Sequence, residues 1–216
     1  MRRTSYFLIF LAVLATTVLN AVSITRPDWL FVHSPDIFHS RVTVTYGLRQ
    51  RCEASTINIP TPGSGGGIHY DEFSCRPFPT RMADQCDDEN RTFCELWWTA
   101  GYAAFLSVAF GGVATFSVLL GSMTRSTRRT MWKSVAGFIT LQACLQIVTF
   151  AIVTDIYRNV RYQPFDYARP SVGYVLNTVS WVANVLLALV VVVTGLAAEA
   201  GHSWAAGNRS YRPLQG

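Results

Sequence analysis

Charged side chains are scarce in this sequence: only 14% of the 216 residues are Asp, Glu, Lys or Arg, whereas 50% are hydrophobic. The hydrophobic residues are gathered in long runs, which a soluble domain does not need. The formal net charge is +5, yet the basic residues form no patch on a soluble segment. The composition therefore predicts a membrane protein and argues against a nucleic-acid partner.

Catalytic and metal-binding motifs are also missing. The histidines are scattered, and none has the spacing of an HExxH-type site (His33, His39, His69 and His202). The sequence contains no Walker loop, nucleophile elbow or CxxC pair. The acidic run at residues 84–89 lacks the spacing and the turn glycine of an EF-hand, so we expect it to be a solvated acidic face. The sequence predicts no enzyme activity, catalytic residue, cofactor, metal ion or small-molecule substrate.

Four nearly uncharged stretches predict four transmembrane helices, at residues 5–25, 97–121, 134–157 and 174–198. Each has roughly 20 residues or more, enough to cross a hydrocarbon core of about 30 Å. Helices are expected because a backbone in lipid must satisfy its own hydrogen bonds. The predicted fold class is an all-α membrane protein, a single four-helix domain over residues 1–216 that carries a small disulfide-bonded β-sheet between its first two helices.

The first apolar stretch has an alternative interpretation as a cleaved signal peptide. Arg2 and Arg3 resemble the basic start of such a peptide, and Ala21-Val22-Ser23 resembles a cleavage site. The apolar part is longer than the usual core of about 7–15 residues, so we expect a retained span. Either alternative leaves the following segment on the same side of the membrane.

Arginine and lysine in the short connecting segments predict the orientation. The segment 122–133 contains four basic residues and no acidic residue, which places it in the cytoplasm (Arg125, Arg128, Arg129 and Lys133). Segments 26–96 and 158–173 are then external, although three arginines in the second weakly oppose this, and the tail 199–216 is cytoplasmic. We expect a multi-pass plasma-membrane protein that arrives through the secretory pathway.

The external segment 26–96 contains four of the five cysteines. Alternating residues predict a strand at 42–48, and 52–59 and 68–75 can form a hairpin through the Gly-rich connector 60–67. The simplest pairing joins Cys52 to Cys75 at the base of this hairpin and Cys86 to Cys94 beyond it. Four cysteines allow three pairings, and the sequence alone does not choose between them. Disulfides agree with an oxidising external compartment.

The sequence also predicts the position or modification of several single residues. Trp29 follows the helix-breaking Pro27 and is expected to anchor at the membrane interface. Cys144 is expected to be a small buried side chain. Asn90-Arg91-Thr92 is a glycosylation sequon on the lumenal side, whereas the sequon at Asn208 should remain unmodified in the cytoplasm.

The predicted spans contain small and polar residues at helical spacing. Ala103, Ser107 and Gly111 form a stripe that allows close helix approach. Polar side chains in the third and fourth spans are expected to hydrogen-bond across the core of the bundle, with a transport path as the alternative (Gln142, Gln146, Thr149, Asn177, Ser180 and Asn184).

Trp29, Gly47-Leu48, Cys52 and Cys75, all in the first external loop, resemble the W…GL(W)…C…C signature of the claudin and peripheral-myelin-protein superfamily. Residues 46–53, 75–79 and 93–102 look like its fungal claudin-like branch, although Arg49 replaces the second Trp. The resemblance implies a left-handed four-helix bundle capped by a small extracellular sheet. It also implies roles in adhesion, barrier formation or membrane organisation, and for fungal members in the cell surface, polarity or cell fusion.

These observations predict a non-enzymatic protein that organises membrane or cell-surface contacts through its external sheet. Adhesion, polarity, cell fusion or a cell-wall process would each fit such a role. Its expected partners are the lipid bilayer and either another membrane protein or a second copy of itself. The alternative is an accessory subunit of a channel, a transporter or a cell-wall enzyme.

Overall fold

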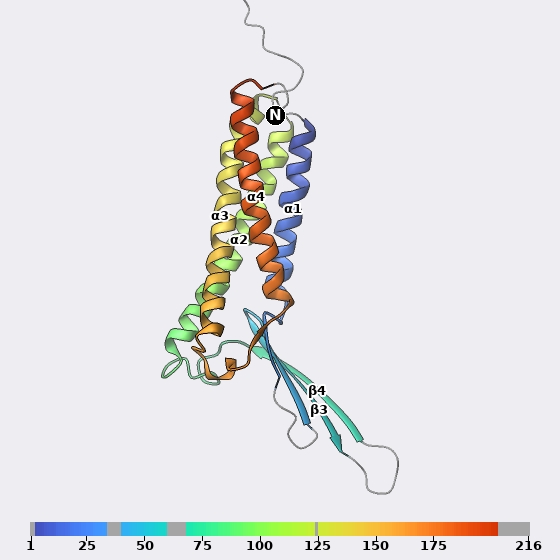
Figure 1. The fold of residues 1–216 in the computed structure, drawn as a ribbon, viewed down its shortest axis with the longest axis vertical. Helices are drawn as coiled ribbons and strands as arrows, with labels where there is room; N and C mark the ends of the chain where they lie inside the picture. Colours follow the sequence, from blue (N-terminus) through green and yellow to red (C-terminus); the bar gives the residue numbers. More distant parts are fainter. Residues whose placement is uncertain (1–2, 34–39, 60–67, 124, 203–216) are drawn as a thin grey trace, which may run out of the picture. The chain divides into compact units, whose positions relative to one another are not determined.

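The structure is a computed structural model that describes residues 3–33, 40–59, 68–123 and 125–202 (Figure 1). The connector predicted at 60–67 and the sequon at Asn208 lie outside the described residues.

Four long helices dominate the fold, and each is long and apolar enough to cross a membrane. They are α1 (Arg3–Thr25), α2 (Arg91–Met123), α3 (Arg125–Arg158) and α4 (Val172–Glu199). Each contains one of the predicted spans. The expected loop at 122–133 is mostly helical, because α3 already begins at Arg125 and residues 125–133 contain neither proline nor glycine to stop it.

A five-stranded antiparallel sheet has the strand order β4-β3-β2-β1-β5. Its strands are β1 (Leu30–His33), β2 (Ser40–Tyr46), β3 (Gln50–Ile59), β4 (Ile68–Pro77) and β5 (Arg169–Pro170). The predicted strand and hairpin are confirmed, and β3 and β4 run beside each other as the longest pair (Figure 1). The sequence did not predict β1 or β5. Strand β5 lies between α3 and α4, so the sheet is not formed by the first loop alone.

The chain divides into two compact units. The helical unit comprises Met1–Asn20, Leu106–Gln146 and Val179–Gly216. The sheet-bearing unit comprises Ala21–Phe105 and Ile147–Thr178. Every helix contributes residues to both units.

The helical unit is a four-helix bundle with an aliphatic core. Val13, Val118, Ile139 and Val191 come from four different helices and are at most 1% exposed. The outward faces of the helices carry large apolar side chains, such as Phe116 at 60% exposure. A helix surface of this kind fits contact with lipid rather than water.

The sheet-bearing unit has an aromatic core. Ring contacts join the sheet and the residue after β4 with the 3-10 helix η1 (Gln163–Phe165), the residue before it, and the first turns of α2. Tyr46 meets Phe165 edge-on at 4.8 Å, Phe78 meets Trp97 edge-on at 5.5 Å, and Phe93 stacks on Tyr162 at 4.3 Å (centroid distances). These contacts hold the sheet against the ends of helices in the same unit.

Candidate functional site in the sheet-bearing unit

Trp29 is completely buried, so its expected position as an interfacial anchor is wrong. Its indole Nε1 donates a hydrogen bond to the Ser23 carbonyl oxygen at 2.7 Å, and its backbone N–H donates to the Tyr46 carbonyl at 2.9 Å. Strand β1 begins at the next residue, Leu30, and the Trp29 ring points into the core of the unit. A Cβ added at Gly173 would lie 2.5 Å from Cδ1 of this ring, so the glycine at the start of α4 makes room for it.

Gly47 occupies a position where no side chain fits. A Cβ built there would lie 2.8 Å from the Arg26 carbonyl oxygen and 2.9 Å from Pro27 Cα, and both are backbone atoms. The Gly47 N–H donates to the Gln50 carbonyl oxygen at 2.8 Å, closing the turn between β2 and β3. Leu48, the next residue, is buried in the aromatic core. The Gly-Leu pair therefore fixes the sheet against the segment that follows α1.

Both disulfides have the predicted pairing. Cys52 and Cys75 are directly opposite each other on β3 and β4, so their bridge closes the base of the hairpin. The Cys86 to Cys94 bridge ties the segment after β4 to the beginning of α2. These covalent links stabilise the sheet and its attachment to α2.

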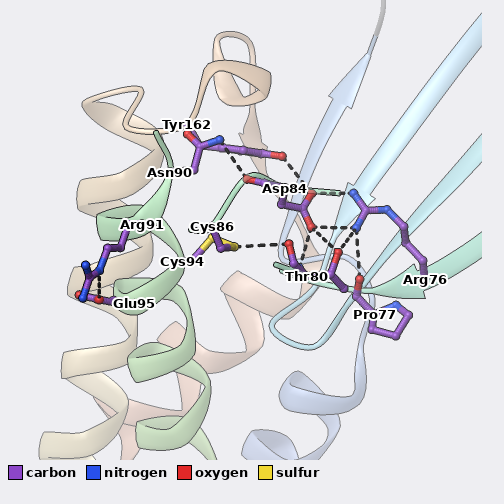
Figure 2. The surroundings of a disulfide bond; sticks show 10 residues. All are labelled: Arg76, Pro77, Thr80, Asp84, Cys86, Asn90, Arg91, Cys94, Glu95 and Tyr162. Atoms are coloured by element: carbon purple, nitrogen blue, oxygen red, sulfur yellow. Dashed lines mark hydrogen bonds and ion pairs between the residues drawn. A yellow bond between two sulfur atoms is a disulfide. The ribbon is translucent and has the colours of Figure 1, made fainter. Parts of the chain in front are cut away.

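The prediction of a solvated acidic face is wrong for Asp84, whose side chain is 0% exposed. Figure 2 shows its carboxylate between Arg76, Thr80 and Tyr162. Arg76 donates from Nη2 to Oδ1 at 2.6 Å and from Nη1 to Oδ2 at 2.8 Å. The Thr80 backbone N–H donates to Oδ2 at 2.8 Å, and the Tyr162 hydroxyl donates to Oδ1 at 3.2 Å. We call these four residues the Asp84 lock.

The protonation states inside the Asp84 lock support one another. Burial alone would raise the pKa of Asp84, but hydrogen bonds from Arg76 and Thr80 outweigh it and hold that pKa below its ordinary value. Hydrogen bonding to Asp84 raises the pKa of Arg76. Burial, followed by the negative charge of Asp84, raises the pKa of Tyr162, which keeps its hydroxyl protonated as a donor. The chemistry is that of a structural clamp.

Sequence spacing could not reveal the Asp84 lock. Asp84 lies 78 residues before Tyr162, and its eight-residue separation from Arg76 matches no known motif. The neighbouring residues Asp87, Asp88 and Glu89 are exposed, as expected for the rest of the run.

Asn90 directly precedes α2 and takes part in the first hydrogen bond of the helix. Its carbonyl oxygen accepts from the Cys94 N–H at 2.9 Å, and its Nδ2 donates to the Asp84 carbonyl oxygen at 3.0 Å. Nδ2 is the atom that would be glycosylated. Because it carries two hydrogens, attachment of a sugar leaves one for this contact. Glycosylation of Asn90 remains a prediction.

The predicted polar contacts between helices are confirmed in each unit. In the sheet-bearing unit the Thr149 hydroxyl donates to the Ala100 carbonyl oxygen at 3.1 Å. In the helical unit Gln146 Nε2 donates to Ser180 Oγ at 2.9 Å, and Asn184 Nδ2 donates to Gln146 Oε1 at 3.0 Å.

Cys144 is exposed, so its predicted burial is wrong. It lies two residues from both Gln142 and Gln146, which are buried, and two residues turn a helix by about 200°. Helical periodicity therefore places the thiol on the outer face of α3.

Within the described ranges, no three His, Cys, Asp or Glu side chains come close enough to form a metal-binding group. The chain matches no protein-family model, and a search of curated proteins finds no significant match.

Proposed function

We propose that this multi-pass membrane protein is claudin-like and acts without catalysis, organising membrane or cell-surface contacts through an extracellular sheet. One observation carries the proposal: the residues of the W…GL…C…C pattern meet in a single structural unit. Trp29 and Leu48 share one core, Gly47 allows the backbone approach beside them, and Cys52 and Cys75 close the adjacent hairpin.

Charge and redox chemistry both support an external position for the sheet. Basic residues in the first turns of α3 favour a cytoplasmic position for the junction between α2 and α3, so the sheet is expected outside. Two disulfides in the sheet-bearing unit fit an oxidising compartment. The plasma membrane, reached through the secretory pathway, is the destination that we propose, as in the fungal claudin-like proteins that the sequence resembles.

The outer surface of the sheet offers an anchor for contacts. Phe73 on β4 is 71% exposed, and β4 forms one edge of the sheet. A large exposed aromatic side chain on an edge strand is typical of a contact residue. A second copy of the chain is the partner that we propose for this edge.

Co-purification of two differently tagged copies from native membranes after brief crosslinking tests the proposal. We expect the second tag to be recovered with the first, and Phe73→Ala to reduce that recovery several-fold at unchanged expression. Met82→Ala is the matched control, since Met82 is 95% exposed but lies outside the sheet. Recovery of a different polypeptide at equal stoichiometry, without self-association, would instead support an accessory subunit of a channel, transporter or cell-wall enzyme.

A further inference from the structure

The helical unit contains a cross-section of polar side chains inside its apolar bundle. All four helices contribute to it, and six of its seven side chains are 0% exposed. We call this group the polar layer: Thr17, Asn20, Ser107, Gln142, Gln146, Ser180 and Asn184.

Hydrogen bonds within the polar layer link the helices in turn. Asn20 Nδ2 on α1 donates to Ser107 Oγ on α2 at 2.5 Å. Gln146 on α3 is bonded to both Ser180 and Asn184 on α4, and the Ser180 hydroxyl donates to the Thr16 carbonyl oxygen on α1 at 2.9 Å. These hydrogen bonds therefore connect α1 with α2, α3 with α4, and α4 with α1.

Three amide oxygens of the polar layer are nevertheless unsatisfied. Asn20 Oδ1, Gln142 Oε1 and Asn184 Oδ1 are buried and accept no hydrogen bond from any residue that the structure describes. Exchanging the oxygen and nitrogen of Asn20 would leave a buried N–H unpaired instead. A buried carbonyl that has lost its hydrogen bonds to water destabilises the fold unless another donor replaces them.

Gln142 is the least satisfied member of the layer. Its Nε2 reaches Thr17 Oγ1 only at 3.5 Å, the long limit of a hydrogen bond. A Cβ added at Gly111 would lie 2.6 Å from Thr17 Oγ1 and 2.8 Å from Gln142 Nε2. The glycine on α2 therefore leaves this part of the layer free of a hydrocarbon side chain.

The chemistry of the site selects its ligand. The oxygens need donors, and the layer contains no carboxylate to neutralise a cation in a medium of low dielectric constant. Water supplies two donors, carries no charge, and can also accept from Gln142 Nε2. We propose that the polar layer binds ordered water molecules that donate to the amide oxygens of Asn20, Gln142 and Asn184.

Water-edited solid-state NMR on the isotope-labelled full chain in liposomes tests the proposal directly. We expect magnetisation to pass from water to the side-chain carbonyl of Gln142, and not to the methyl groups of Leu141, which is exposed on the outer face of the same helix. The transfer should be the same in sodium, potassium and choline buffers. Absence of transfer to Gln142 would overturn the proposal, and a signal that requires sodium or potassium would replace water with a cation.

The sign of a stability change gives a second readout. Gln142→Met keeps the approximate shape and removes the amide. If water satisfies this amide, the substitution should lower Tm by about 2–4 °C, because a water-mediated hydrogen bond is nearly as favourable as a direct one. If the amide is unpaired, its removal should raise Tm, which would contradict the proposal. Gln146→Met is the control: its amide is paired within the chain, so Tm should fall in either case.

Discussion

The carboxylate of Asp84 connects two neighbouring segments, the end of β4 and the turn at Thr80, with the connection between α3 and α4, which is distant in sequence. Its removal would leave the Arg76 guanidinium and the Tyr162 hydroxyl without their shared acceptor. Arg76 is one-third exposed, so water offsets part of that loss.

We expect Asp84→Asn to destabilise the sheet-bearing unit by about 1–3 kcal/mol, the range for a buried polar group that loses its partner. Thermal unfolding in detergent, followed by tryptophan fluorescence, measures the change. Asp87→Asn is the matched control because Asp87 is exposed on the same segment. Equal stability of the two variants would show that the Asp84 lock contributes nothing.

The pH dependence of the same protein provides an independent check. The pKa of Asp84 is lower in the folded state than its ordinary value of about 3.9, so the folded state binds this proton less readily than the unfolded chain. The stabilisation is complete at neutral pH. It decreases as the pH falls below about 4 and is lost below the folded-state pKa. Asp84→Asn should lack this component of acid sensitivity.

The backbone of Val160 is in a sterically unfavourable conformation. It adopts φ 46°, a left-handed conformation that β-branched residues rarely occupy. The Arg161 N–H donates to the Ile156 carbonyl oxygen at 3.1 Å, which places Val160 at the position after a helix where glycine is favoured.

Val160→Gly should therefore raise the free energy of unfolding by about 1 kcal/mol, because the steric penalty of the left-handed conformation disappears. Differential scanning fluorimetry would detect this as a higher Tm. Val160→Ala, which removes only the branching, should give a smaller gain. A decrease in Tm for the glycine variant would refute this assignment of strain.

At the scale of elements, the attachment of the sheet depends on close backbone contact beside Gly47. Gly47→Ala places a methyl group against backbone atoms of Arg26 and Pro27, so β2 must shift away. We expect loss of monodisperse protein in size-exclusion chromatography and incomplete formation of the Cys52 to Cys75 bridge in non-reducing peptide maps.

Gly101→Ala is the matched control in α2. Its Cβ would meet only the Leu48 carbonyl oxygen, at an ordinary 3.7 Å, and alanine favours a helix. This variant should behave like the unmodified protein. Normal behaviour of Gly47→Ala as well would show that the sheet does not depend on this contact.

At the scale of the whole molecule, the proposed orientation predicts glycosylation at one sequon only. Asn90 should be modified and Asn208 should not, because the two lie on opposite sides of the membrane. A glycosidase-sensitive mobility shift should disappear in Asn90→Gln and persist in Asn208→Gln. The reverse pattern, in protein shown to be inserted, would invert the topology.

The sequence by itself determined the four helices and the hairpin, whereas only the structure chose the two disulfide pairings from the three that four cysteines allow. A continuous apolar run in lipid can satisfy its backbone hydrogen bonds only as a helix. A segment with alternating apolar and polar residues is compatible with few structures other than a strand. The same periodicity identified the buried amides of α3 and α4, because in a helix the residues three or four positions apart share one face.

Tertiary structure alone decided the short strands, the burial of Trp29 and the Asp84 lock. Strand β5 has two residues, too few for any alternation, and exists because Leu30 pairs with Pro170 from a distant segment. Trp29 is buried because Gly173 leaves room for its ring. Asp84 lies in an acidic run whose composition predicts exposure to solvent. Its environment comes from Arg76 and Tyr162, which only the folded chain brings to it.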